Sequence, residues 1–193
     1  ASRYALTPSA PDGIAAKDQD KARKWIFETY QADLIKAEEE TGISKYTLAG
    51  LIFTESHGNR YAVSCTGAGG LTQFIPSTAK DYGLEHKSWL DYGLRPVTGK
   101  DGGQDNRLVH GIECDGRDWE KSRLCRKGAE RHCDFIWDER FYPENSIPAA
   151  ARYLSDLMQG GKKKRTLWQA LNLYSGGNKH YAGAVLAEAE NIR

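Results

Sequence analysis

Glu55 is a glutamate whose surroundings suit proton transfer. It follows the apolar run Leu51–Phe53 and lies where a helix is expected to end. Burial favours the neutral form of a carboxyl group, and the negative end of a helix dipole opposes a further negative charge. Both effects keep Glu55 protonated closer to neutral pH, as a general acid requires. A glutamate turned out to solvent at a helix end fits the same local pattern, so this context alone leaves both interpretations open.

An ordered pattern surrounds this glutamate. It consists of Glu55-Ser56, Asn59, Ala62-Val63-Ser64 and the stretch Gly67–Ala79, GAGGLTQFIPSTA. The pattern resembles the soluble lytic transglycosylase (SLT) domain, a family similar in turn to goose-type lysozymes. Two later stretches, Pro143–Leu154 and Ala170–Gly177, resemble the family's next helix start and its final motif. The resemblance therefore covers about residues 43–84 and 142–185.

The resemblance implies a role for each matching residue. Glu55 corresponds to the family's single catalytic acid/base, and Tyr174 corresponds to a tyrosine whose hydroxyl lies beside the catalytic carboxyl. Ser64 and Gln73 correspond to positions that line the cleft and hydrogen-bond the sugar with the lactyl and acetamido groups. Phe74, in the same stretch, is a candidate to bind substrate by stacking on a sugar ring, with core packing as the alternative.

The sequence departs from the family's pattern at two positions. Thr72 stands where methionine is usual, and Ser175 follows the tyrosine where asparagine is usual. Neither change replaces the acid, so we expect altered contacts in the cleft and retained activity.

The pattern supplies one carboxylate, whereas most glycosidases need two. A substrate that brings its own nucleophile removes the need for the second. In muramic-acid glycans the acetamide can attack the anomeric carbon, while Glu55 protonates the leaving oxygen and then deprotonates the sugar's 6-hydroxyl. The resemblance thus implies a lytic transglycosylase without a cofactor. Such an enzyme cleaves the MurNAc–GlcNAc β-1,4 bond of peptidoglycan and forms 1,6-anhydromuramic ends.

Three other functions stay open at this point. A goose-type muramidase would hydrolyse the same bond, with an acidic residue such as Asp91 or Asp101 positioning water. A non-catalytic wall-binding component of a secretion or tail assembly is a second alternative, which the intact Glu55, Gln73 and Tyr174 disfavour. A partner protein that docks on the irregular middle of the chain is compatible with either enzyme.

The elements that must position these residues are predicted to be helices. Apolar residues recur at helical spacing in Lys21–Glu40, and Ser44 can cap a second helix that ends near His57-Gly58. Pro76 can open a third helix that Gly83 closes. Further helices are predicted over residues 146–158, 166–174 and 178–190. We expect a mainly α, lysozyme-like single domain over residues 21–193, preceded by a flexible arm or linker at residues 1–20.

The stretch from about residue 85 to 143 lacks a sustained period and is rich in Gly and Asp. We expect it to be an irregular insertion that contains cysteines. The four cysteines suit two disulfides, with free thiols or a metal site as alternatives. We predict that Cys65 joins one of Cys114, Cys125 and Cys133 while the other two pair together. Disulfides would place the protein in the periplasm or outside the cell.

Composition excludes several classes of partner. A net charge of +1 over 193 residues argues against nucleic acid, which needs clustered positive charge. No apolar run approaches the length of a membrane span. The usual paired C-x-x-C spacing of a zinc site is missing, so no metal is expected. The chain begins at Ala1, which fits a mature form after signal-peptide removal or a piece of a longer protein.

Overall fold

A computed structural model describes residues 19–60, 62, 68–85, 95–98, 104–109, 138–161 and 163–193. The helices are α2 (Gln19–Thr41), α3 (Lys45–Ser56), α4 (Pro76–Asp81), η4 (Glu139–Phe141), α5 (Pro143–Gln159), α6 (Leu167–Tyr174) and α7 (Tyr181–Ile192). Two short strands, β1 (Arg95–Thr98) and β2 (Gln104–Val109), pair antiparallel. The predicted mainly α fold is confirmed, whereas the strand pair was not predicted because its segment carries no alternating pattern.

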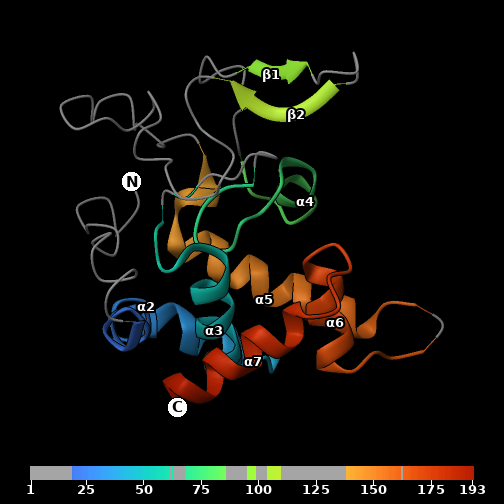
Figure 1. Ribbon diagram of the computed structural model, residues 1–193. Coiled ribbons are helices and arrows are strands. Elements are labelled where there is room, and N and C mark those ends of the chain that lie inside the picture. Colours follow the sequence, from blue (N-terminus) through green and yellow to red (C-terminus); the bar gives the residue numbers. More distant parts are fainter. Residues whose placement is uncertain are drawn as a thin grey trace.

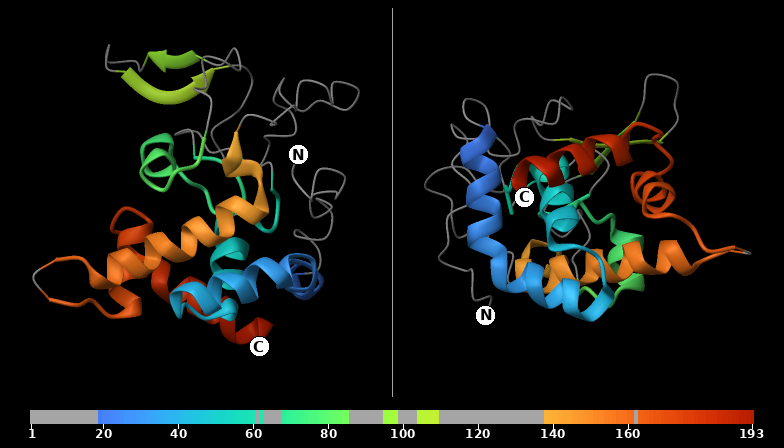
Figure 2. Two further views of the ribbon diagram at one scale, coloured as in Figure 1. Left: turned by 180° about the vertical axis from the view of Figure 1, so that it is seen from behind. Right: turned by 90° about the horizontal axis from the view of Figure 1, so that it is seen from below.

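Helix α3 lies in the middle of the helical part, with α2, α5 and α7 packed against it (Figures 1 and 2). Its first turn is capped as predicted, because the Ser44 hydroxyl accepts a hydrogen bond from the Tyr46 amide. It ends at His57, which adopts the left-handed conformation (φ 50°) and donates its amide hydrogen to Phe53 O. The helix is buried along almost all of its length, so its sequence is apolar on every side rather than on one face.

Helix α7 lies directly on α3 because residue 50 is a glycine. A Cβ at Gly50 would come within 2.5 Å of Val185 O and 2.8 Å of Ala189 N, both of them backbone atoms. The guanidinium of Arg23 on α2 also pairs with Glu188, which fixes α7 to a second helix. This close packing brings the first residue of α7, Tyr181, beside the last turn of α3.

A buried ion pair lies beneath the turn that follows α3. Asp138 and Arg140 are both 0% exposed, and the carboxylate accepts hydrogen bonds of 2.9 Å and 2.6 Å from the guanidinium. The guanidinium also donates to Phe74 O at 3.4 Å. A Cβ at Gly70, whose φ is 81°, would lie 1.9 Å from Arg140 O. The segment before α5 therefore packs against the backbone of residues 69–74 in a way that only glycine permits.

The two ends of the irregular middle of the chain meet. The Glu139 amide donates to Glu85 O at 2.7 Å, and the Glu85 amide donates to Glu139 Oε2 at 2.8 Å. The chain thus leaves and rejoins the helical part at one place, which is the geometry of an insertion. Apart from the two strands, residues 86–137 lie outside the described residues, as do residues 1–18. The insertion and the arm remain predictions.

The Asp138–Arg140 pair predicts a large cost for removing one partner. Asp138→Ala removes the carboxylate that accepts two hydrogen bonds from a buried guanidinium, which lowers the free energy of unfolding by about 3–5 kcal/mol. Denaturant unfolding measures the change. Glu190→Ala is the matched control, since the side chains of its pair with Arg193 are 66% and 60% exposed, and we expect a change within about 0.5 kcal/mol. Equal effects of the two variants would contradict this prediction.

Candidate functional site

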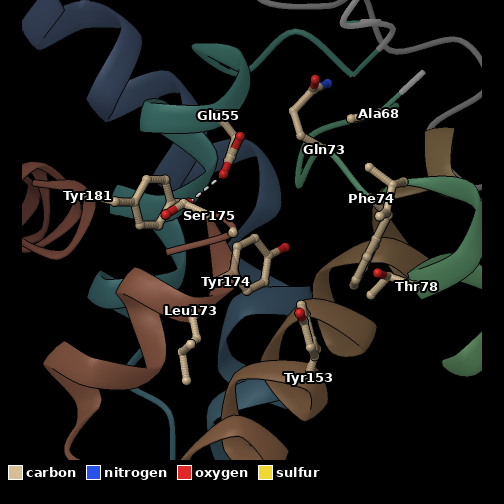
Figure 3. Close-up of a pocket in the computed structure, with 12 residues that line it drawn as sticks. Glu55, Ala68, Gln73, Phe74, Thr78, Tyr153, Leu173, Tyr174, Ser175 and Tyr181 are labelled. Atoms are coloured by element: carbon tan, nitrogen blue, oxygen red, sulfur yellow. Dashed lines mark hydrogen bonds between the residues drawn. The ribbon is translucent and has the colours of Figure 1, made fainter. Parts of the chain in front are cut away.

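A cavity of about 480 Å³ opens beside the last turn of α3 (Figure 3), and we call it the Glu55 cavity. Helix α3 contributes Glu55, and the turn before α4 contributes Gln73 and Phe74. Helices α4 to α7 contribute Thr78, Tyr153, Leu173, Tyr174 and Tyr181. Segments more than one hundred residues apart in the sequence thus meet around one carboxyl group, at a volume typical of ligand sites.

Glu55 is part-buried in the cavity wall and accepts a hydrogen bond from the Tyr181 hydroxyl at 2.5 Å (Figure 3). Burial raises the pKa of Glu55 from 4.5 to about 7, and the Tyr181 hydrogen bond opposes this by lowering it. Loss of hydration is the larger of the two effects. A carboxyl group with this pKa is protonated in a large fraction of molecules at neutral pH and can also release its proton there.

Tyr181 contacts the carboxyl group, although no sequence pattern singles this tyrosine out. It is the first residue of α7 and is 8% exposed. Burial and the charge of Glu55 raise the pKa of its phenol above the usual value of 10, so it remains a donor. In the sequence it looks like one more apolar position of the last helix. Only the contact of α7 with α3 at Gly50 gives it a role in the site.

Tyr174 lines the same cavity, but its hydroxyl has a different partner. It donates to Thr72 O at 2.8 Å. Its ring lies nearly parallel to that of Tyr181, with centroids 6.3 Å apart and planes 10° apart. The hydroxyl that hydrogen-bonds Glu55 is that of Tyr181, while the charge of Glu55 helps to raise the pKa of the Tyr174 phenol. Tyr174 instead fixes the backbone at Thr72 and supports the Tyr181 ring, and its part in catalysis remains a prediction.

Gln73 presents only an acceptor to the cavity. It adopts the left-handed conformation (φ 50°), and its side-chain Nε2 donates to Ala62 O at 3.0 Å and to Gly70 O at 2.9 Å. Both amide hydrogens are used by these carbonyl groups, so Oε1 is the atom left for a ligand. Phe74 lines the cavity but is 2% exposed, so most of its ring packs in the core. Ser64 lies outside the described residues.

Glu55 is the one acidic residue among those described that line the cavity. In the part of the chain with described structure, no group of three or more His, Cys, Asp and Glu residues is placed to hold a metal ion. Within the same part, no helix combines the length and the apolar character needed to cross a membrane. All four cysteines, Asp91 and Asp101 lie outside it. The disulfide pairing and a water-positioning aspartate therefore remain untested.

Comparison with known proteins gives one match. Residues 33–104 match the family model of the transglycosylase SLT domain. No curated protein and no solved structure matches the chain. The matched segment includes Glu55, Gln73 and Phe74, while Tyr174 and Tyr181 follow it in the sequence. The match and the helical architecture agree with the lysozyme-like domain that the sequence predicted.

Removing the Tyr181 hydrogen bond is expected to shift the pH dependence of activity in one direction. Tyr181→Phe removes the interaction that lowers the pKa of Glu55, so the pKa rises above about 7. Activity that needs protonated Glu55 then persists to higher pH, and the alkaline limb of the kcat/KM profile moves upward. Tyr46→Phe, far from the cavity on α3, is the control and leaves the limb in place. A downward shift for Tyr181→Phe would exclude this role for the hydroxyl.

Proposed function

We propose that this chain, which carries a transglycosylase SLT domain, cuts the β-1,4 bond from MurNAc to GlcNAc and leaves 1,6-anhydromuramic ends. The domain indicates peptidoglycan-cleaving activity of the lytic transglycosylase type in general. The observation that carries the finer proposal is the single acidic residue of the described cavity lining, Glu55, with a pKa near neutrality. One carboxyl group that can both give and take a proton at the same pH suits a reaction in two proton-transfer steps.

In the first step, protonated Glu55 gives its proton to the glycosidic oxygen. The acetamide oxygen of the muramic residue attacks the anomeric carbon as the bond to the leaving sugar breaks, which yields an oxazolinium ion and a free 4-hydroxyl. This is the substrate-assisted route that replaces a second carboxylate. The Tyr181 hydroxyl already hydrogen-bonds Glu55 Oε1, so it stabilises the carboxylate that forms.

In the second step, the Glu55 carboxylate removes the proton of the 6-hydroxyl on the same muramic residue. The 6-oxygen attacks the anomeric carbon and breaks its bond to the acetamide oxygen, which restores the acetamide and closes the 1,6-anhydro ring. Glu55 ends protonated, as it began, and no water is consumed. The buried ring of Tyr181 and the part-buried ring of Tyr174 line the cavity beside the carboxyl group and lower the polarity of its surroundings, which supports a route that uses no water.

We place this activity outside the cytoplasm, in the periplasm or in the secreted fraction, because SLT domains act on peptidoglycan there. A non-catalytic wall-binding role would need no carboxyl group with a pKa near 7 in the binding cavity. A muramidase would share the acid but release a reducing end. Turnover and product analysis separate the three functions.

Glu55→Gln is expected to reduce kcat to near zero with the fold retained, because an amide neither donates an acidic proton nor accepts one. The folded pKa is about 7 and the unfolded value is 4.5, so Glu55 contributes stability that is full below pH 4.5 and lost as pH rises through 7. The variant has no such loss. Between pH 4.5 and pH 8 the wild type should lose roughly 3 kcal/mol of its free energy of unfolding relative to the variant. Denaturant unfolding of both proteins at the two pH values measures this difference. Wild-type turnover by the variant would require another catalytic residue.

The products give the second test of the reaction. Purified peptidoglycan digested in ¹⁸O-water is expected to yield muropeptides with 1,6-anhydro ends and no label at the anomeric carbon, measured by mass spectrometry. A muramidase digest serves as the control for label incorporation. Labelled reducing ends from this protein would favour hydrolysis and reject the internal displacement.

A further inference from the structure

The loop between α5 and α6, which we call the basic loop (residues 160–165), projects from the helical part of the protein (Figures 1 and 2). Arg165 closes its base, since its amide donates to Met158 O at 2.8 Å and its guanidinium donates to Leu157 O at 2.9 Å. Gly161 turns the chain with a φ of 94°, a conformation that residues with a side chain rarely adopt. Several contacts therefore fix the base of the loop against the end of α5.

Positive charge gathers around this loop. Residues 157–187 hold five of the 27 Lys and Arg residues and none of the 26 Asp and Glu residues. The rest of the chain therefore has more acidic than basic residues. Lys163 and Lys164 in the loop are exposed, as is Lys179 in the turn before α7. None of these three lysines forms an ion pair within the described part of the chain. Unpaired positive charge on a projecting loop attracts an anionic surface.

An exposed tryptophan follows the basic loop. Trp168 is the second residue of α6 and is 48% exposed. One edge of its indole lies against α7, since a Cβ at Gly183 would come within 3.4 Å of it. Tryptophan recurs where lipid headgroups meet water, because its ring is apolar and carries one polar N–H. Lysine is attracted to the same layer when the lipids are anionic. A soluble polyanion has no apolar layer for the indole.

We propose that the basic loop and Trp168 form a docking surface for a membrane that carries anionic phospholipids. Lys163 and Lys164 lie against the lipid phosphates, and the exposed part of the indole enters the headgroup layer. A bilayer is flat on the scale of one domain, so the segment that projects from the domain reaches it first. None of these three residues lines the Glu55 cavity. Docking at this surface therefore does not require the reaction proposed for Glu55.

Helix α2 offers a matched control for the charge of the loop. The side chains of Lys24 and Lys36 are 74% and 64% exposed, but each has a glutamate 3.8 Å away on the same helix. Helix α2 begins on the side of the helical part opposite to the basic loop (Figures 1 and 2). Lys163→Gln with Lys164→Gln removes two positive charges from the loop. Lys24→Gln with Lys36→Gln removes the same charge elsewhere.

Co-sedimentation with vesicles measures the affinity. Phosphatidylcholine vesicles are compared with vesicles that hold about one third phosphatidylglycerol. We expect the wild type to bind only the anionic vesicles. The loop variant should bind them roughly 10- to 30-fold more weakly, since each lysine near an anionic surface contributes about 5-fold, and the α2 variant should match the wild type. Replacing both loop lysines by arginine should retain the affinity. Equal binding to both kinds of vesicle, or equal losses in the two glutamine variants, overturns the docking surface.

Fluorescence tests whether Trp168 enters the headgroup layer. The chain has five tryptophans, so Trp168→Phe is needed to identify the contribution of this one. We expect the emission of the wild type to shift to shorter wavelength when anionic vesicles are added, because the indole leaves water. The shift should be lost in Trp168→Phe. A shift that persists unchanged in this variant rejects the surface described here as the one that meets the bilayer.

A soluble polyanion separates the membrane from other anionic partners. Inorganic polyphosphate is added to the vesicle mixture at the same concentration of phosphate as the lipid supplies. We expect it to release little of the protein, because it has no apolar layer for Trp168. Complete release assigns the basic loop to a soluble polyanion and overturns the membrane assignment. If the chain binds anionic vesicles but never cleaves glycan, the proposed reaction fails while the docking surface is still measured.

Discussion

The close contact of α7 with α3 sets the surroundings of Glu55. Because residue 50 has no side chain, the backbone of α7 lies against α3, and Tyr181 reaches the carboxyl group of Glu55. The carboxyl group is part-buried where it meets Tyr181. Burial raises the pKa of Glu55 to about 7, and the Tyr181 hydroxyl lowers it by a smaller amount. The packing of α7 on α3 and the proton affinity of Glu55 are therefore linked, through Gly50 on α3 and Tyr181 on α7.

A buried ion pair that is remote in the sequence stabilises the other side of the cavity. The buried Asp138–Arg140 pair lies beneath the turn at Gly70, and the side-chain amide of Gln73 donates to Gly70 O in that turn and to Ala62 O. Because these two bonds use both amide hydrogens of Gln73, its Oε1 is the side-chain atom that can still accept a hydrogen bond. The strand pair and the rest of the irregular middle begin and end next to this support, at Glu85 and Glu139.

Four tyrosines pack their rings in one cluster, but their hydroxyl groups have different surroundings. Tyr181 bonds the acid, Tyr174 bonds the Thr72 carbonyl, and Tyr82 bonds Asp156 outside the cavity. Tyr153 has its ring in the same cluster and its hydroxyl toward the ligand space. The aromatic faces stabilise the wall by packing. The hydrogen-bond partner of each hydroxyl, and not the packing of its ring, therefore distinguishes one tyrosine from another.

The sequence alone predicted the helical fold and the family resemblance, and it singled out Glu55 as the candidate acid. Local signals suffice for these, because the cap Ser44, the helix-opening Pro76, the helical periodicity and the ordered motif around Glu55 each depend on neighbouring residues. The partner of the acid was not predicted. Tyr181 lies 126 residues from Glu55 and looks like an ordinary apolar helix position. Only packing of α7 on α3 makes it a hydrogen-bond donor to the carboxyl group, because direction and distance between remote side chains are properties of the tertiary structure.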